Sequence, residues 1–307
     1  MMKKKILVIQ GSKLNRVNTE TDTTLFLSLE AQKRGYHIYY FEPQDLSFLS
    51  GKVLAKCFHL TFFEKTKNFY KINKKLSYNL LEANVILIRN DPPFNQRYIN
   101  TTFILEHLAK KVKIINHPRS IREVPEKLFS MRLAKYMPPT LISENLDEIK
   151  IFFKINKKVI IKPVNSYSGN EILLLNDFNS KIIKKYIKKH SHIIFQKFLP
   201  QISKGDKRVF IINGKIKGSI SRVPKKNSIL SNMSKGAVAK ITKLTKKEIK
   251  ISKKLAVILK KENIYFAGID FINGKLIGDI NVTSPTGLAS YYSLTKINLA
   301  KYFWDNI

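Results

Sequence analysis

The sequence predicts a mixed α/β protein, and three observations support this fold class. The N-terminal third alternates short apolar runs with helical stretches, a pattern that is typical of an open parallel sheet. Two later pairs, Asn213-Gly214 and Asn273-Gly274, each join two apolar runs and predict β-hairpins. The 307 residues, 44% of them hydrophobic, are enough for two or three subdomains with their own cores.

The first part of the chain is expected to build the parallel sheet. Its predicted elements are strands at residues 6–9, 37–41, 85–89 and 112–115, and helices at residues 25–34, capped within 22–24 and stopped by Gly35, and at 99–111. Ligands of such sheets bind beyond the carboxyl ends of the strands, so residues 10–12 and 89–93 should form one rim. Arg89 on this rim offers a planar fork for a substrate carboxylate, although a surface arginine beside a turn is the simpler interpretation.

Two segments of this region give weaker signals. Residues 50–79 are aromatic and rich in lysine without a clear period, so we expect a short hairpin, an irregular connection and no chemistry. Residues 120–123 fit a capping box, which should start a helix that carries Lys127.

The middle of the chain contains a candidate phosphate site. An apolar strand at residues 159–163 carries Lys162 near its end, and the loop 164–170 leads to another strand at 171–174. Such a strand–turn–strand unit can close over phosphates with backbone N–H groups, although it is not a Walker A motif. A further strand at residues 193–200 runs into a linker.

The next stretch predicts a hairpin, a lid and a helix. The hairpin around Asn213-Gly214 is headed by the charged string Asp206-Lys207-Arg208. Residues 225–243 are polar and irregular, which makes them a candidate mobile lid. Residues 244–262 have a helical period that opens at Thr245 and leads to the second hairpin.

The second hairpin predicts a metal site. Its two-residue turn should pair Ile272 with Lys275, Asp270 with Ile277, and Gly268 with Asp279. Side chains alternate along strands, so Asp270, Asp279 and Asn281 should share one face. Two carboxylates and an amide oxygen suit Mg²⁺, which also holds nucleotide phosphates. A solvated polar face is the alternative that spacing alone leaves open.

The net charge is unusual for a globular enzyme. Fifty-six basic and 22 acidic residues give +34, a value at which nucleic-acid binding must be considered. The lysines are spread along the whole chain, however, and no RNP-like aromatic motif, zinc-finger spacing or basic-region heptad occurs. We therefore expect no specific nucleic-acid partner, while the charge can still attract anionic substrates.

The expected compartment is the cytoplasm. Cys57 is the single cysteine, so no intrachain disulfide can form, and a reducing environment is favoured. The apolar run at residues 6–9 is too short for a signal peptide and lacks a small-residue cleavage site. No run approaches the length of a transmembrane helix, and no membrane partner is expected.

Motifs along the whole chain carry a resemblance to a known family. In order, they are residues 29–36, Asp91-Pro92-Pro93-Phe94, Asn116-His117-Pro118, Glu126-Lys127-Leu128-Phe129, Ile161-Lys162-Pro163, residues 205–209, Arg222-Val223-Pro224 and residues 279–286. This order resembles bacterial glutathione synthetase, an ATP-grasp ligase. The string at 279–286, in register with the one at 205–209, is the most specific part of the match.

The resemblance implies a fold and a division into domains. A Rossmann-like pre-ATP-grasp domain is expected at residues 1–119, followed by an ATP-grasp fold. The small lid subdomain of that fold would span residues 120–199, and the large C-terminal lobe 200–307, with a mobile loop at about 225–243. Family members are commonly tetramers, so a homo-oligomer is expected.

The implied reaction converts ATP, γ-glutamylcysteine and glycine into glutathione, ADP and phosphate. The cysteinyl carboxylate would attack the γ-phosphate, and the amine of glycine would then attack the acyl phosphate. Such a reaction needs neutralisation of phosphoryl charge and exclusion of water more than a covalent nucleophile.

Roles carry over by position, as implied by the resemblance. ATP would contact Lys127, Lys162, Gly169, Gln196, Lys197, Phe198, Leu199 and Asp206. Mg²⁺ or Mn²⁺ would bind Asp270, Asp279 and Asn281. Arg208 and Arg222 would stabilise the acyl phosphate and the transferring phosphoryl group. The peptide substrate would be oriented by Asp22, Arg89, Asn232, Ser284 and Thr286.

The sequence departs from the family pattern at three places. Asp279 stands where the family has Glu, in a hairpin that carries one extra residue. The phosphate loop 165–169 is poorer in glycine than usual, and Leu230 replaces an arginine in a shortened lid. Two alternatives therefore stay open besides glutathione synthesis, namely an ATP-grasp ligase with another acceptor and a nucleotide-binding pseudoenzyme.

Overall fold

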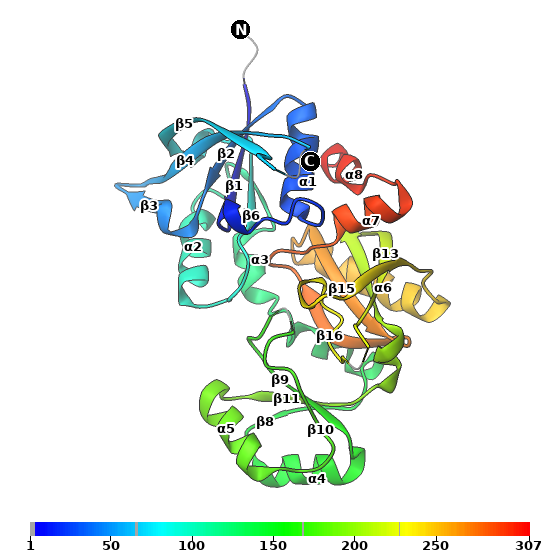
Figure 1. Cartoon of the computed structure of the whole chain (residues 1–307). Coiled ribbons are helices and arrows are strands. Elements are labelled where there is room, and N and C mark those ends of the chain that lie inside the picture. Colours follow the sequence, from blue (N-terminus) through cyan, green and yellow to red (C-terminus); the bar gives the residue numbers. More distant parts are fainter. Residues whose placement is uncertain (1–3, 65–66, 168, 227) are drawn as a thin grey trace.

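The strands of the protein form three sheets within the residues that the computed structural model describes, which are 4–64, 67–167, 169–226 and 228–307. We call them the N-terminal sheet, the small sheet and the C-terminal sheet. The N-terminal and small sheets lie at opposite ends of the molecule, and the C-terminal sheet lies between them (Figure 1). The predicted α/β fold class is confirmed.

The N-terminal sheet contains the predicted parallel strands. Its strands are Lys5–Gly11 (β1), Tyr36–Phe41 (β2), Leu46–Leu49 (β3), Lys52–Phe62 (β4), Tyr70–Asn79 (β5), Val85–Arg89 (β6) and Lys113–Ile115 (β7). The associated helices are Thr23–Lys33 (α1), Gln96–Glu106 (α2) and Pro118–Glu123 (α3), with short 3-10 turns at Leu14–Arg16 (η1), Pro43–Asp45 (η2) and Leu80–Glu82 (η3). β1 pairs in parallel with β2 and β6, and β6 with β7. α1 packs on one face of this sheet and α2 on the other.

Residues 50–79 form a longer and more regular hairpin than predicted. Residues 54–62 of β4 pair with residues 70–79 of β5, with one register shift after His59. Among the described strands β5 pairs with β4 alone, and residues 71–75 of β5 are exposed. Charged residues are common on such edge strands. In β5 they interrupt the alternation of apolar and polar residues that would have indicated a strand.

The predicted capping box at residues 120–123 is wrong. α3 begins at Pro118, and His117 before it makes no side-chain cap. Proline is favoured at the first position of a helix because its missing N–H has no intrahelical partner there. The helix ends at Glu123, so Lys127 lies on the segment beyond it. The helix predicted at 99–111 is also shorter, because α2 ends at Glu106 and the chain continues in turns.

The small sheet is antiparallel, with the strand order β10-β9-β11-β8. Its strands are Thr140–Ser143 (β8), Val159–Pro163 (β9), Leu173–Leu175 (β10) and Ile193–Lys197 (β11), and its helices are Leu146–Asn156 (α4) and Ser180–His190 (α5). The strand predicted at 171–174 begins later because Glu171 has a φ of +58°, outside the extended region. Phe153 of α4 and Ile183 of α5 pack on the strands in one core cluster.

The C-terminal sheet has the order β14-β13-β12-β15-β16 and is antiparallel throughout. Its strands are Asp206–Ile212 (β12), Lys215–Val223 (β13), Val238–Ile241 (β14), Phe266–Ile272 (β15) and Lys275–Asn281 (β16). Helices Lys246–Lys261 (α6), Leu288–Thr295 (α7) and Leu299–Asp305 (α8) and 3-10 helices Phe129–Tyr136 (η4), Pro200–Lys204 (η5) and Met233–Lys235 (η6) complete this part. Both Asn-Gly hairpins are confirmed. Within its described residues, the predicted lid 225–243 contains the short 3-10 helix η6, and its end forms β14 on β13.

The domain boundaries at residues 119 and 199 stay a prediction. Phe129 and Leu133 of η4 belong to the same core cluster as α6 and the C-terminal sheet, while the small sheet begins at Thr140. The segment from Val124 to η4 thus packs on the C-terminal sheet.

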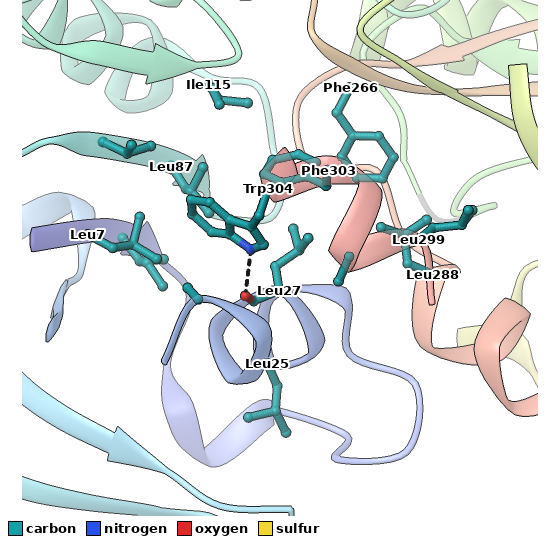
Figure 2. Close-up of a cluster of buried hydrophobic side chains, with 14 of the residues drawn as sticks. Leu7, Leu25, Leu27, Leu87, Ile115, Phe266, Leu288, Leu299, Phe303 and Trp304 are labelled. Atoms are coloured by element: carbon teal, nitrogen blue, oxygen red, sulfur yellow. Dashed lines mark hydrogen bonds between the residues drawn. The ribbon is translucent and has the colours of Figure 1, made fainter. Parts of the chain in front are cut away.

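The C-terminal helix returns to the N-terminal sheet. α8 lies beside α1 (Figure 1), and its residues share a core cluster with Leu7 and Leu87 of the sheet. Trp304 of α8 is buried, and its indole N–H donates to the carbonyl oxygen of Leu27 at 2.9 Å (Figure 2). The two ends of the chain therefore stabilise one common core.

Replacing Trp304 by phenylalanine should lower the free energy of unfolding by about 2 kcal/mol, because a buried hydrogen bond is lost and a small cavity is left. Urea unfolding followed by circular dichroism measures this, since the variant lacks the only tryptophan fluorophore. Tyr292→Phe is the control, because Tyr292 is 40% exposed. A loss no larger than that of the control would contradict the importance of this contact.

Asn116 joins the N-terminal sheet to the C-terminal sheet. Its Nδ2 donates to the carbonyl oxygens of Phe266 and Val282 at 2.8 and 2.6 Å. Its Oδ1 accepts from the N–H groups of Tyr265 and Phe266 at 2.9 and 2.8 Å. The side chain is buried, so both of its polar atoms are satisfied by backbone groups of the other sheet. Asn116 thereby sets the position of Val282, which lies next to the cavity described below.

Candidate active site

A cavity of about 640 Å³ lies where the three sheets meet. It is lined by the following predicted site residues: Asp22, Lys127, Lys162, Gly169, Gln196, Lys197, Phe198, Leu199, Asp206, Arg208, Arg222, Asn232, Asp270, Asp279, Asn281, Ser284 and Thr286. Arg89 lines a small adjoining cavity of about 40 Å³ together with Asp22, Ser284 and Thr286. The structure thus brings together residues that lie far apart in the sequence, while their roles stay predictions.

Two buried lysines reach the cavity from different segments. Lys162, near the end of β9, donates from Nζ to the carbonyl oxygen of Ile277 at 2.7 Å and lies 3.9 Å from Oδ2 of Asp279. Lys127 donates to the carbonyl oxygen of Ser166 in the phosphate loop. Burial lowers the pKa of Lys127, and the carboxylate of Asp279 only partly offsets this effect. An anion bound here would favour the charged form of Lys127.

The end of β11 and the linker after it, residues 196–199, also line the cavity. The amide of Gln196 donates to Oγ1 of Thr140 at 2.8 Å. The backbone N–H groups of Lys197 and Phe198 are bonded to the carbonyl oxygens of Pro139 and Lys158. The carbonyl oxygen of Leu199 accepts from the N–H of Ile202 at 3.1 Å, whereas the N–H of Leu199 has no backbone partner among the described residues.

Two arginines and two aspartates form a buried charged cluster on β12, β13 and β15. Arg208 binds Asp270 through Nε–Oδ1 and Nη2–Oδ2 contacts of 2.8 and 2.7 Å. Arg222 donates from Nε to Oδ1 of Asp206 at 2.8 Å, and its Nη2 contacts both Asp206 and Oδ2 of Asp270, the latter at 2.9 Å. Strand pairing explains the cluster, because Arg208 lies opposite Asp270 and Asp206 opposite Arg222.

The charge state of this cluster follows from its contacts. Burial alone would raise the pKa of Asp270, but the two guanidinium groups outweigh burial and hold this pKa well below its usual range. Asp270 is therefore ionised. Its two carboxylate oxygens form ion pairs with the guanidinium groups of Arg208 and Arg222. The bidentate geometry makes these strong, directional hydrogen bonds.

The predicted register of the β15–β16 hairpin is wrong beyond its turn. Ile272 pairs with Lys275 as expected, but Gly268 pairs with Asn281 rather than with Asp279. β16 therefore has two more residues than β15 in this stretch, and Gly278 within it has a φ of +94°. A glycine inside a strand is a common sign of such a bulge.

The shared face of the three predicted metal ligands survives the bulge. An insertion of two residues keeps the alternation of side chains in phase, so Asp279 and Asn281 still line the cavity with Asp270. Nδ2 of Asn281 donates to Oδ2 of Asp270 at 3.3 Å, which leaves Oδ1 of Asn281 as an acceptor.

These oxygen donors fit a hard divalent cation. No group of three or more His, Cys, Asp or Glu side chains placed to hold a metal occurs in the described part of the chain, so the site depends on two carboxylates and an amide. The side chain of Asp279 is 28% exposed, and among the described cations only Lys162 forms an ion pair with it, at 3.9 Å. The carboxylate of Asp270 is shared with the arginines.

The small adjoining cavity combines a buried arginine with two carboxylates. Arg89 donates from Nε to Oγ1 of Thr24 at 3.0 Å, and its buried Nη1 has no partner among the described residues. Asp22 caps α1 by accepting from the N–H of Leu25 at 2.7 Å. Asp91 belongs to the same cavity. Burial lowers the pKa of Arg89, which an incoming carboxylate would reverse.

Comparisons with known proteins agree with this geometry. A model of the prokaryotic glutathione synthetase N-terminal domain matches residues 5–122, and one of the prokaryotic glutathione synthetase ATP-grasp domain matches residues 126–296. The chain belongs to the prokaryotic glutathione synthetase family.

Full-length relatives support the same assignment. Glutathione synthetase of Bradyrhizobium diazoefficiens is 35% identical, with 98% of this chain and 97% of the relative covered. Glutathione synthetase of Buchnera aphidicola subsp. Acyrthosiphon pisum is 34% identical, with 99% of this chain and 96% of the relative covered. The resemblance of the motifs to this family is confirmed.

Solved structures confirm the ATP-grasp fold. D-cycloserine synthetase DcsG has a TM-score of 0.66 at 10% identity, over 98% of this chain and 99% of that one. The ATP-grasp ligase PsnB, complexed with minimal precursor, Mg and ADP, has a TM-score of 0.61 at 13% identity, over 98% and 96% of the two chains.

In this glutathione synthetase family member the lid and the phosphate loop meet above the cavity. Oγ of Ser231 donates to Oδ2 of Asp206 at 2.6 Å, and Ser231 is buried. Gly169 has a φ of +72°, and a Cβ there would lie 2.5 Å from Oδ1 of Asn232. The close approach requires glycine at this position. Ser168 and Asn227, which belong to these two predicted loops, lie outside the described residues.

Several residues of the site were missed by the sequence interpretation. Arg16, Asp91, Glu126, Tyr167 and Ser231 also line the cavity. Glu126 and Asp91 stand within the family motifs, so those motifs held a signal for them. Ser231 lies within the predicted lid 225–243, but nothing in the sequence alone indicates its contact with Asp206 or the position of Arg16, because both depend on how distant segments fold against each other.

Among the described residues, none of the helices combines the length and apolar character that crossing a membrane requires.

Proposed function

We propose that the chain joins γ-glutamylcysteine and glycine into glutathione while ATP is converted into ADP and phosphate. The observation that supports this most is the meeting of Arg208, Arg222, Lys127 and Lys162 in one cavity of a member of this family. Phosphoryl transfer depends on positioning and on neutralising the charge that develops on the phosphoryl oxygens. Four cations from four segments of the chain are suited to that task.

The proposed reaction has two steps. A carboxylate oxygen of the cysteinyl residue attacks the γ-phosphorus, the bond to the bridging oxygen of ADP breaks, and an acyl phosphate forms. The amine of glycine then attacks the acyl carbon, phosphate leaves, and the nitrogen loses a proton. In both steps Arg208 and Arg222 would stabilise oxygens that gain negative charge, and the lysines would hold the phosphates of the nucleotide.

The divalent metal of this proposal is Mg²⁺, with Mn²⁺ as the alternative. Asp279, Oδ1 of Asn281 and the carboxylate of Asp270 would hold it, and a bound cation there would supply neutralisation of phosphate charge. Asp270 contacts the guanidinium groups of both Arg208 and Arg222. To bind the metal, it would have to give up at least one of these two contacts. That exchange would leave Arg208 able to contact a phosphoryl oxygen.

We assign the small adjoining cavity to the γ-glutamyl end of the peptide. A γ-linked glutamate keeps its own α-carboxylate and α-ammonium groups. The buried, unpartnered Nη1 of Arg89 suits the carboxylate, and Asp22 and Asp91 suit the ammonium group. Ser284 and Thr286 line both cavities and would orient the peptide between them.

The lid has a protective role in this proposal. An acyl phosphate is lost when water reaches it, so a closed site is needed during the second step. Ser231 ties the lid to Asp206, and Asn232 contacts the phosphate loop at Gly169. Leu230, in place of the arginine that the family pattern has here, adds an apolar surface to the lid.

We also propose a cytoplasmic location, a homo-oligomeric and specifically tetrameric state, and no specific nucleic-acid or membrane partner. The first two rest on membership of the family and on the reaction, which consumes ATP. The third rests on the dispersal of the lysines along the chain. Light scattering after size-exclusion chromatography would measure the oligomeric state.

The acceptor is tested by product analysis. The purified chain is incubated with Mg-ATP, γ-glutamylcysteine and either glycine, alanine or ammonium, and the products are identified by mass spectrometry. We expect glutathione with glycine and little product with the other two amines. A preference for another amine would overturn the acceptor assignment, and binding of ATP without any product would identify a pseudoenzyme.

A further inference from the structure

Glu126 makes an unusual set of contacts with the end of β16. One carboxylate oxygen, Oε1, accepts from the N–H groups of Val282 and Thr283 at 3.0 and 3.2 Å and from Oγ1 of Thr283 at 2.7 Å. Its backbone carbonyl oxygen accepts from the N–H of Ile280 at 2.9 Å. Glu126 therefore holds residues 280, 282 and 283 by four hydrogen bonds.

The segment that Glu126 holds carries two predicted functions. Asn281, on the metal-facing side of β16, lies between the held residues Ile280 and Val282. Ser284, which lines both cavities, follows directly after Thr283. β16 is the last strand of its sheet, and no other described strand pairs with its outer edge. The side chain and backbone of Glu126 take the place of such a strand.

The residue next to Glu126 reaches the opposite wall of the cavity. Nζ of Lys127 donates to the carbonyl oxygens of Val164, at 3.4 Å, and Ser166 in the phosphate loop. The two adjacent residues therefore connect the metal-facing strand of the C-terminal sheet to the phosphate loop of the small sheet. A displacement of Glu126 or Lys127 would therefore move β16 relative to the phosphate loop.

We propose that Glu126 is a positioning residue, which sets the distance between the oxygens of Asn281 and Ser284 and the phosphate-binding Lys127. This proposal rests on the function proposed above. Glu126 acts through hydrogen bonds to backbone N–H groups, so an amide oxygen in the same place should serve nearly as well as a carboxylate. A direct metal ligand or a general base would instead require the charge.

The variants Glu126→Ala and Glu126→Gln separate these possibilities, with Glu123→Ala as the matched control. Glu123 lies three residues earlier and pairs only with exposed Arg119 among the described cations. Calorimetric titration measures the affinity for ADP with Mn²⁺ and without it, and kinetics measure kcat. The calorimetric readout needs no turnover, so it remains decisive even if the proposed reaction fails.

We expect Glu126→Ala to weaken Mn²⁺-dependent ADP binding and to lower kcat by about 10- to 100-fold, as is common when a residue supporting a metal ligand is removed. ADP binding without metal should change less than Mn²⁺-dependent binding, because no hydrogen bond joins Glu126 to the described linker residues 196–199 or to Lys162. Glu126→Gln should restore most of the loss, and Glu123→Ala should behave like the unmodified chain.

Two results would overturn the proposal. The first is a folded Glu126→Ala variant with unchanged Mn²⁺-dependent binding. The second is a Glu126→Gln variant as impaired as Glu126→Ala, which would show that the charge itself is needed. Should Glu126→Ala not fold, Thr283→Val removes one of the donors that Glu126 accepts. It should weaken Mn²⁺-dependent binding in the same direction by about two- to fivefold, and an unchanged affinity would refute the proposal.

Discussion

Replacing Arg222 by methionine should lower kcat about a thousandfold, the largest effect on activity that we expect from a single substitution. An arginine that stabilises a transferring phosphoryl group contributes at least this much in related chemistry. Arg222 is also the link between two buried carboxylates, because its Nη2 contacts both Asp206 and Asp270. Without it these two negative charges would face each other in the wall of the cavity.

The loss of Arg222 affects folding as well as catalysis, so kcat must be measured per folded molecule. Removing one partner of a buried ion pair costs about 3–5 kcal/mol of the free energy of unfolding. Circular dichroism at the assay temperature gives the folded fraction. Arg132→Met is the control, because Arg132 forms an exposed pair with Glu262 and should leave kcat unchanged. Full kcat of folded Arg222→Met would refute the assigned role.

Replacing Asn116 by aspartate should lower the free energy of unfolding by about 4 kcal/mol, an effect as large as that expected from the loss of Arg222. The substitution keeps the shape of the side chain and the acceptor for Tyr265 and Phe266. It removes both donors, however, so the carbonyl oxygens of Phe266 and Val282 would face a buried negative charge.

Urea unfolding of Asn116→Asp measures this loss. Asn100→Asp is the matched control, because Asn100 is exposed and the same change in charge should have little effect there. Equal stability of the two variants would mean that Asn116 does not hold the sheets together. Under conditions where Asn116→Asp is folded, its kcat should also be lower than that of the unmodified chain. The reason is that Asn116 holds Val282, and the cavity-lining residues Thr283 and Ser284 follow directly after it.

The parts of the fold that the sequence predicted are those with strong local signals. Asn213-Gly214 and Asn273-Gly274 form the predicted turns because both residues of each pair accept positive φ values. Asp22 caps α1 as expected. Its carboxylate accepts from the N–H of Leu25, only three residues later, so the cap depends on the local sequence alone. The parallel strands β1, β2, β6 and β7 follow from apolar runs separated by helices.

The parts that were wrong or missed depend on distant contacts. The bulge at Gly278 changes the register of β16, and its effect on Asp279 cannot be derived from turn geometry alone. β5 was missed as a long strand because its lysines lie on an exposed edge. Glu126 is 154 residues or more from the N–H groups that it holds, so periodicity could not reveal its function.

The most direct test of the proposed function is phosphate release from Mg-ATP with γ-glutamylcysteine, with and without glycine. We predict release that depends on both substrates, with one glutathione formed for each phosphate released. Steady release without glycine, at the same rate, would mean that water reaches the acyl phosphate and would contradict the proposed closure by the lid. No release at all, from a chain that binds ATP, would contradict the assignment of Arg208, Arg222 and the metal-facing residues to catalysis.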